Sequence, residues 1–520
     1  MVRYFIGCAV FTLCIISAPA QKPAAVHISV QTDKPVRTMA GGIGASWHAI
    51  GTELPSRKPE GGSSYSGSGW GGNPDPGDAK AWKSLREYAN WLGLDWVRVE
   101  LDQRTYEPKR REFSWENPDM RALYRILDWA EHKHVDVFLQ QFWGNVDWNA
   151  YPSLENDPVG RLRSAPRSVS EYAYGLGELV NHLTRVKHYT CIRWLCINNE
   201  PGHDEFSWWQ DSNLKALPIA PAIKAVREEL DSRGIALPIS APDWTDLPKL
   251  EVDKIDFDEW LGAYDLHSYN AVFDDMELGE GRYALSVASE RLAEWAKFAH
   301  DRNKPLFLSE MGTMAFGWGK RDAGPGSYES GLKDASLIVR GINAGVDGFN
   351  RWSFVNRGDL DGQWQLVDTW DSDANHLLSE FKPHQNVYNE IGLLSRFTAK
   401  HSSVLETRVE SESLAGEKRS LVAAALRSLK GNLTVCVVNE TGRDVDSTIS
   451  LDGLAKKTVL YKYAITPADR DRSDVAIRPL GKFTVGPGST DVVDHIPATS
   501  IAVYSNYRLD AHAPGKISED

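Results

Sequence analysis

Eight short apolar segments recur between residues 42 and 354, and a segment with helical periodicity separates almost every neighbouring pair. This alternation constrains the fold most, because parallel strands joined by helices form either a closed barrel or an open doubly wound sheet. The expected helices lie near residues 78–92, 118–133, 169–187, 217–233, 247–261, 284–302 and 329–344. The expected strands are Gly42–His48, Trp96–Leu101, Val135–Phe142, Ile192–Asn199, Leu237–Ala241, Tyr264–Tyr269, Leu306–Glu310 and Gly348–Phe354.

Glycine placement and loop lengths favour the closed barrel. A doubly wound sheet that binds a nucleotide carries a glycine-rich loop between its first strand and the next helix. The cluster Gly41-Gly42-Ile43-Gly44 precedes or lies within a strand, so we interpret it as close backbone packing. Segments that follow strands are long, and those that follow helices are mostly short. The sequence therefore predicts an α/β fold, a (β/α)8 TIM barrel whose site lies at the carboxyl ends of its strands.

A different pattern begins after about residue 390, where short alternating runs replace the helical period. We expect a barrel over residues 41–390, a C-terminal all-β sandwich over 391–510 and a polar tail over 511–520. The extended segment 21–40 is a candidate for a further strand of the sandwich. The expected sandwich strands are Leu421–Leu426, Leu433–Asn439, Ser447–Leu451, Thr458–Ala464, Lys482–Val485 and Ser500–Ser505.

Residues 1–20 have the three parts of a secretory signal peptide. Arg3 provides a positive start, Tyr4–Ser17 is a short apolar run, and Ala18-Pro19-Ala20 places small residues before the cleavage site. We expect the mature chain to begin at Gln21 and to be secreted, either extracellular or periplasmic. No second apolar run approaches the length that spans a membrane.

Composition narrows the range of partners. The formal net charge is −13, so we expect neither nucleic acid nor an anionic membrane as a partner. Nineteen Trp and eighteen Tyr offer flat faces that pack against sugar rings, which favours a carbohydrate substrate. After cleavage Cys191, Cys196 and Cys436 remain, and this odd number predicts buried, unpaired thiols.

Two of the expected strands end in a glutamate. The run Trp194–Pro201 reads Trp-Leu-Cys-Ile-Asn-Asn-Glu-Pro, and its proline prevents Glu200 from continuing an interior strand. The seventh strand ends in Glu310, which Met and Gly follow. The fourth and seventh strands of an eight-stranded barrel face each other, so the two carboxylates can flank one bond.

Such a pair matches the chemistry of glycosidic bond hydrolysis, which needs a proton for the leaving oxygen and a nucleophile on the opposite face of the sugar. Carboxyl groups about 5–5.5 Å apart give direct attack and retained configuration. We predict Glu200 as the acid/base and Glu310 as the nucleophile. The negative charge of Glu310 favours a proton on Glu200 until the covalent intermediate removes that charge.

The order of these motifs along the barrel resembles glycoside hydrolase clan A, the retaining barrel glycosidases that include families 5, 30 and 39. The resemblance implies that Arg98 contacts the nucleophile, that Tyr269 hydrogen-bonds it and that His267 lines the catalytic subsite. It further implies that Asn199 contacts the sugar 2-hydroxyl and that Trp352 lies under the sugar ring.

The third strand departs from that pattern, because Gln140-Gln141-Phe142-Trp143 ends without a histidine. No single family's signature fits throughout, so no particular sugar or linkage follows. Trp143, directly after this strand, is our candidate for an aromatic wall of the substrate site.

The candidates also have plainer interpretations. Arg98 can pair with Glu100, His267 can be a core histidine, and Trp352 can fill the core. Metal chemistry is the main rival hypothesis, but the possible ligands lack the spacing of a zinc motif or an EF-hand. The possible ligands are His132, His134, His203, Asp204, Glu205, Asp359, Asp361 and Asp368. Hydrolysis by a Ser/His/Asp triad is disfavoured because no Gly-x-Ser-x-Gly elbow follows a strand.

We therefore predict a retaining glycoside hydrolase that cleaves O-glycosidic bonds, of β configuration, in extracellular polysaccharide or oligosaccharide. The chemistry requires no cofactor and no metal. The alternative is a carbohydrate-binding barrel without activity, and the retention of Glu200, Glu310, Arg98 and Tyr269 argues against it.

Overall fold

The structure is a computed structural model, and the predictions for residues 1–20, for Trp143 and for the tail 511–520 fall outside the part that it describes. No helix among the described residues has the length and apolar character needed to cross a membrane. The described residues are 22–49, 71–141, 147–154, 164–201, 208–211, 213, 215–279, 281–313, 324–356, 364–371, 376–472, 475–488 and 491–509.

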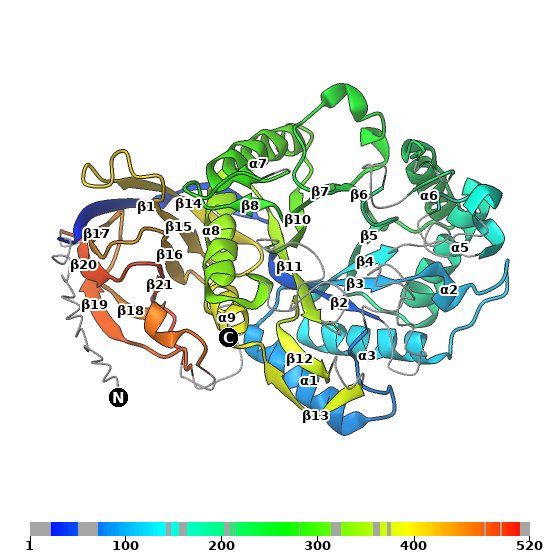
Figure 1. Ribbon diagram of the computed structural model, residues 1–520, viewed down its shortest axis with the longest axis horizontal. Helices are drawn as coiled ribbons and strands as arrows, with labels where there is room; N and C mark the ends of the chain where they lie inside the picture. Colours follow the sequence, from blue (N-terminus) through cyan, green and yellow to red (C-terminus); the bar gives the residue numbers. More distant parts are fainter. Residues whose placement is uncertain are drawn as a thin grey trace, which may run out of the picture.

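Eight parallel strands close into a barrel in the order β10–β11–β2–β3–β4–β5–β6–β7, which confirms the predicted (β/α)8 fold (Figure 1). Most barrel strand residues are buried on both faces, because side chains fill the interior and helices cover the exterior. The strands are β2 (Gly42–His48), β3 (Trp96–Leu101), β4 (Asp136–Gln141), β5 (Ile192–Cys196), β6 (Ile239–Trp244), β7 (Ala263–Ser268), β10 (Leu306–Met311) and β11 (Gly348–Val355).

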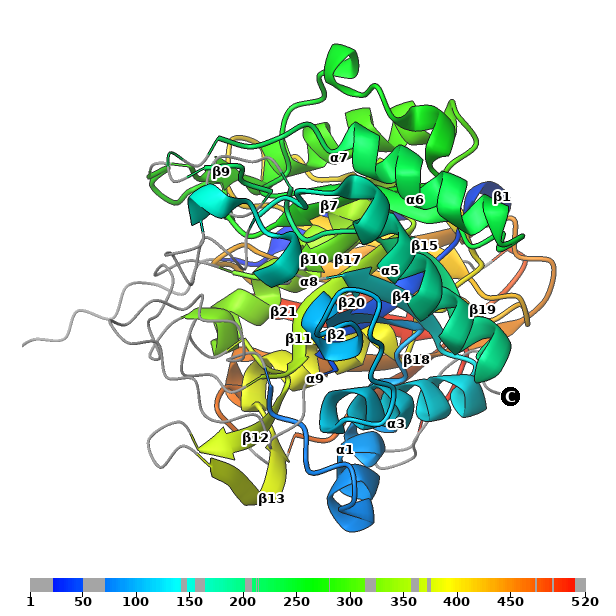
Figure 2. The same ribbon diagram turned by 90° about the vertical axis from the view of Figure 1, so that its right-hand side faces the viewer.

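Helices surround the strands, as Figure 2 shows from the end of the molecule that lies to the right in Figure 1. Side chains of Asp78, Asn117, Ser168 and Ser327 accept backbone N–H groups and so define where four of these helices begin. The helices are α1 (Ala79–Leu92), α2 (Gln103–Tyr106), α3 (Pro118–Lys133), α5 (Val169–Asn181, continued by a π-helical turn, His182–Val186), α6 (Ala220–Ser232), α7 (Leu285–His300), α8 (Tyr328–Ala344) and α9 (Gln385–Ser395).

The prediction of a helix at residues 247–261 is wrong. Two 3-10 turns, Val252–Lys254 and Asp258–Trp260, occupy this segment. Leu247 adopts a left-handed conformation with φ of 48°, Pro248 lacks a backbone N–H, and the aspartates of this segment have low helix propensity. The other 3-10 turns are Asp147–Asn149, Pro152–Leu154, Gly324–Gly326 and Pro467–Asp469.

Nine strands form the second sheet, in the order β19–β18–β21–β16–β15–β14–β1–β17–β20. Every strand contributes buried side chains to one core, and the edge strands β19 and β20 lie in contact, so the sheet curls around that core. The strands are β1 (Ala24–Met39), β14 (Ser402–Glu410), β15 (Leu421–Arg427), β16 (Leu433–Asn439), β17 (Val445–Asp452), β18 (Thr458–Ile465), β19 (Gly481–Val485), β20 (Asp491–Ile496) and β21 (Ser500–Ser505).

The two parts of the molecule pack through α8 and α9, which stand between barrel and sheet in Figure 1. Strand β1 pairs in parallel with β17 and antiparallel with β14, so the chain passes through the sheet before it enters the barrel. The three cysteines in the described part of the chain, Cys191, Cys196 and Cys436, are buried and unpaired, as predicted. Two small ribbons complete the fold: β8 (Ala271–Val272) with β9 (Tyr283–Ala284), and β12 (Val367–Asp371) with β13 (His376–Pro383).

Candidate active site

Glu200 and Glu310 converge at the carboxyl ends of the barrel strands. Glu200 follows β5, and Glu310 lies near the end of β10. One oxygen of each carboxylate and a ring nitrogen of His267 all lie within 4.8 Å of one another. The two glutamates are only 5% and 4% exposed, respectively. Their charges therefore interact at short range in a poorly solvated site.

Arg98 of β3 connects Glu310 to three other residues of the site. Its Nη1 donates to Glu310 Oε1 and to Glu100 Oε1. Its Nη2 donates to Asn199 Oδ1 at 2.8 Å and to Asp243 Oδ2 at 3.1 Å. Arg98 therefore makes both the contact with Glu310 that the family resemblance implies and the ion pair with Glu100 that was the alternative interpretation.

His267 and Tyr269 approach from β7 and from the residue just after it. The Nδ1 atom of His267 lies 2.7 Å from Glu200 Oε1 and 3.4 Å from Glu310 Oε2. The Tyr269 hydroxyl donates to Glu310 Oε2 at 2.5 Å. Glu310 thus receives hydrogen bonds from Arg98 and Tyr269, and His267 lies against both glutamates.

Trp352, the aromatic candidate within the described residues, packs against other aromatic side chains. Trp352 of β11 is buried, with its ring edge-on to Tyr269 at 6.4 Å between centroids. Trp364 packs in turn against Trp352 at 5.6 Å and against Tyr269 at 5.2 Å. These three rings form a buried aromatic cluster, and the Tyr269 hydroxyl connects this cluster to Glu310.

Burial and charge set the proton affinities of this cluster. Burial raises the pKa of Glu310 to about 7, with Glu100 and Glu200 adding to the rise and Arg98 and His267 opposing it. Burial also favours the uncharged form of His267, but Asp243 and Glu310 outweigh it and hold the pKa well above its ordinary value. Protons in the cluster are therefore shared among coupled groups near neutral pH.

Several members of the cluster were not predicted. Asp243 lies near the end of β6 and contacts Arg98 and His267, yet the expected strand stopped at Ala241. The signal was the same as for the two glutamates, an acidic residue at the end of an apolar run. His48 at the end of β2 pairs with Glu100, and Gln140 of β4 lies 3.5 Å from Asp243.

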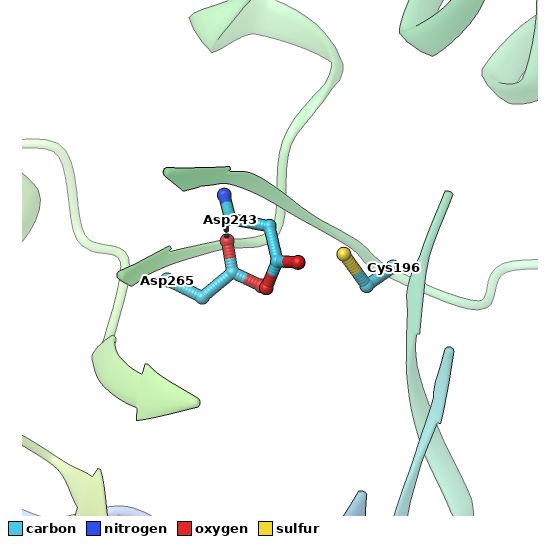
Figure 3. Close-up of side chains that lie close together, drawn as sticks. All are labelled: Cys196, Asp243 and Asp265. Atoms are coloured by element: carbon cyan, nitrogen blue, oxygen red, sulfur yellow. Dashed lines mark hydrogen bonds between the residues drawn. The ribbon is translucent and has the colours of Figure 1, made fainter. Parts of the chain in front are cut away.

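Two groups of side chains bring three possible metal ligands together: Glu200 with His267 and Glu310, and Cys196 with Asp243 and Asp265. Figure 3 shows the carboxyl groups of Asp243 and Asp265 against each other, with the Cys196 sulfur beside Asp243. Burial holds the pKa of the Cys196 thiol well above its usual range, and Asp243 already meets the cations of Arg98 and His267. This donor set suits a hydrogen-bonded cluster better than a metal ion.

Comparison with known protein families identifies the class of protein to which this chain belongs. The family model described as cellulase, glycosyl hydrolase family 5, matches residues 55–329, more than half of the chain. The chain belongs to glycosyl hydrolase family 5. The family 5 chain is therefore a glycosidase, and the predicted resemblance to clan A is confirmed.

A search of curated protein sequences found no significant match to this family 5 chain. Solved structures resemble it in fold. Xylanase C of family 30 from Talaromyces cellulolyticus is 14% identical, with a TM-score of 0.58 over 92% of this chain and 99% of that one. A family 51 α-L-arabinofuranosidase from Thermotoga petrophila is also 14% identical, with a TM-score of 0.58 over 92% of this chain and 100% of that one. At these identities the likeness shows the fold alone.

Proposed function

We propose that the protein is a retaining glycoside hydrolase that cleaves β-O-glycosidic bonds of extracellular polysaccharide or oligosaccharide by double displacement. The observation that carries this proposal is the approach of the Glu200 and Glu310 carboxylates to within 4.8 Å. Inverting enzymes need about 6.5–9.5 Å between the two groups to hold a water molecule, and retaining enzymes about 5–5.5 Å. The signal peptide expected over residues 1–20 would direct the enzyme out of the cytoplasm.

In the first step a Glu310 oxygen attacks the anomeric carbon and the glycosidic C–O bond breaks. The proton of Glu200 passes to the leaving oxygen, and a covalent glycosyl ester of Glu310 remains. Arg98 and Tyr269 both donate to Glu310, so they favour the arrangement in which Glu310 is charged and Glu200 carries the proton. His267 stabilises the Glu200 carboxylate that forms as the proton leaves.

In the second step Glu200 takes a proton from water while the water oxygen attacks the same anomeric carbon. The ester bond breaks and Glu310 leaves as a carboxylate, which Arg98 and Tyr269 stabilise again. Two inversions give overall retention. Arg98 fixes the amide oxygen of Asn199, which supports a role for the Asn199 amide nitrogen as a donor to the sugar 2-hydroxyl.

A pocket lined by Pro201, the residue after the acid/base, is our candidate site for the leaving part of the substrate. It has a volume of about 420 Å³. Half-buried Trp244 contributes a flat apolar face to it, and such faces pack well against sugar rings. The pocket is lined by Pro201, Leu217, Ile219, Trp244, Pro248 and Phe257, among others.

Turnover of nitrophenyl β-glycosides and β-linked polysaccharides by wild type and Glu310→Gln tests the proposal. We expect the variant to lose at least ~10⁴-fold in kcat/KM because it lacks a nucleophile. Proton NMR of the first product should show the β anomer. The matched control is Glu440→Gln, which alters a buried glutamate paired with Arg340 at the junction with the sheet. An α product, or equal losses in the two variants, would defeat the proposal.

A further inference from the structure

Asp243 is an acidic group of the cluster to which the reaction scheme above gives no task. Its carboxylate contacts residues from five other parts of the barrel. We propose that Asp243 is a positioning residue for the acid/base, which holds His267 as a doubly protonated ring against Glu200 and holds the Glu200 main chain in place. This inference rests on the proposed function, because it assigns Glu200 the transferred proton.

Asp243 accepts hydrogen bonds from two donors at Oδ1 and from three donors at Oδ2. Oδ1 accepts from His267 Nε2 at 2.9 Å and from Ser309 Oγ at 3.2 Å. Oδ2 accepts from Arg98 Nη2 at 3.1 Å, from the Glu200 backbone N–H at 3.3 Å and from Gln140 Nε2 at 3.5 Å. Donors that surround both oxygens leave no acceptor for a proton on the carboxyl group itself, so this arrangement fits the ionised form. Burial works against this charge, but His267 and Arg98 outweigh it and hold the pKa of Asp243 at about 2.

Carboxylates therefore face both ring nitrogens of His267. Asp243 of β6 lies at Nε2, while Glu200 after β5 and Glu310 of β10 lie at Nδ1. A ring that donates at both nitrogens must carry both protons. Without the charge of Asp243, one nitrogen would lose its acceptor and the neutral ring would become more favourable.

The charge of His267 affects the transfer of the proton from Glu200. As Glu200 gives its proton to the leaving oxygen, a carboxylate appears 2.7 Å from His267 Nδ1. A charged donor there stabilises the product of the transfer by more than a neutral ring does. Asp243 therefore acts on Glu200 through the His267 side chain and through the Glu200 backbone.

A second carboxyl group supports Asp243. The backbone N–H of Asp243 donates to Asp265 Oδ1 at 2.8 Å, the dashed line in Figure 3. Asp243 and Glu200 both adopt left-handed backbone conformations, with φ of 56° and 46°. Such conformations are unfavourable for residues other than glycine and persist where contacts impose them. Burial and the charge of Asp243 raise the pKa of Asp265 to about 7, so near neutral pH the negative charge stays on Asp243.

Leaving-group dependence separates this role from a purely structural one. A poor leaving group such as phenol needs protonation by Glu200, and 2,4-dinitrophenolate leaves without it. For Asp243→Asn we expect kcat/KM to fall about 100-fold on the phenyl glycoside, within the range of general acid catalysis. On the dinitrophenyl glycoside of the same sugar we expect a fall of less than about 5-fold. Equal losses on both substrates would overturn the proposal.

Asp347→Asn is a matched control. Asp347 is also buried between a histidine and an arginine, with His300 at 2.8 Å and Arg37 at 3.1 Å. It precedes β11 and so lies at the opposite end of the barrel from Trp352. We expect Asp347→Asn to reduce stability without changing the ratio of the two substrates. The same selective loss in this variant would contradict the proposal.

Nitrogen-15 NMR of the imidazole groups tests the assignment without catalysis. The His267 resonance, identified by its absence in His267→Gln, should remain that of a doubly protonated ring at pH 8.5 in wild type and become neutral in Asp243→Asn. A neutral ring in wild type overturns the proposal even if Asp243→Asn does not fold. If wild type cleaves no glycoside while His267 behaves as expected, the proposed function fails and the link between Asp243 and His267 stands.

Discussion

Removal of the Tyr269 hydroxyl provides a sharp test of how the nucleophile is held. In wild type this hydroxyl donates to Glu310 Oε2 at 2.5 Å inside a buried site. A hydrogen bond to a charged group contributes about 1.5–3 kcal/mol. Tyr269→Phe removes that contribution from the ionised form of Glu310 only. At 1.36 kcal/mol per unit, the pKa of Glu310 should rise by about 1–2 units.

The direction of the pH effect follows from the protonation state in which Glu310 attacks the sugar. Burial already raises the pKa of Glu310 to about 7, and protonated Glu310 cannot act as a nucleophile. Wild-type kcat/KM should therefore fall as pH falls through about 7, and this limb should move up by about 1–2 pH units in Tyr269→Phe. At pH 6 the variant should be about 10- to 100-fold less active than wild type.

The assay is kcat/KM on an aryl glycoside from pH 4 to pH 9, with Tyr264→Phe as the control. Tyr264 lies on the same strand, β7, and its hydroxyl also donates to a carboxylate, Asp258 Oδ1, at 2.5 Å. The control should leave the acidic limb in place. An unshifted limb in Tyr269→Phe, or an equal shift in both variants, would refute the reasoning.

Three further predictions follow from the same geometry. Glu310→Gln should raise the free energy of unfolding at pH 8 by about 1–3 kcal/mol in urea titrations. The stability that protonated Glu310 provides is fully present below its ordinary pKa of 4.5 and is lost as pH rises through about 7, so the gain should vanish at pH 4. Asn199→Ala should lower kcat/KM about 100-fold on a glycoside with a 2-hydroxyl and leave a 2-deoxy glycoside unaffected, since that contact stabilises the transition state. Trp244→Ala should raise KM about 3- to 10-fold on a tetrasaccharide and leave KM for an aryl monosaccharide unchanged, because only the longer substrate reaches the pocket beside Pro201.

Local sequence pattern predicted the parts of the fold that local forces control. The strands Gly42–His48 and Trp96–Leu101 and the helix Pro118–Lys133 have the expected ends, since apolar periodicity and the Asn117 cap encode them directly. The segment 247–261 misled the same reasoning, because its apolar spacing fits a helix while its aspartates favour turns. Strand β14 was missed because its exposed positions carry polar residues that lack a clear apolar alternation.

For the site, the sequence by itself located Glu200 and Glu310 at strand ends, because a barrel presents the carboxyl ends of its strands on one face. Only the tertiary structure brought Asp243 to His267, placed Arg98 among three carboxylates and raised the pKa of Glu310 to about 7. Periodicity is written in neighbouring residues, whereas charge coupling depends on distances that exist only after the barrel has closed and excluded water from its centre.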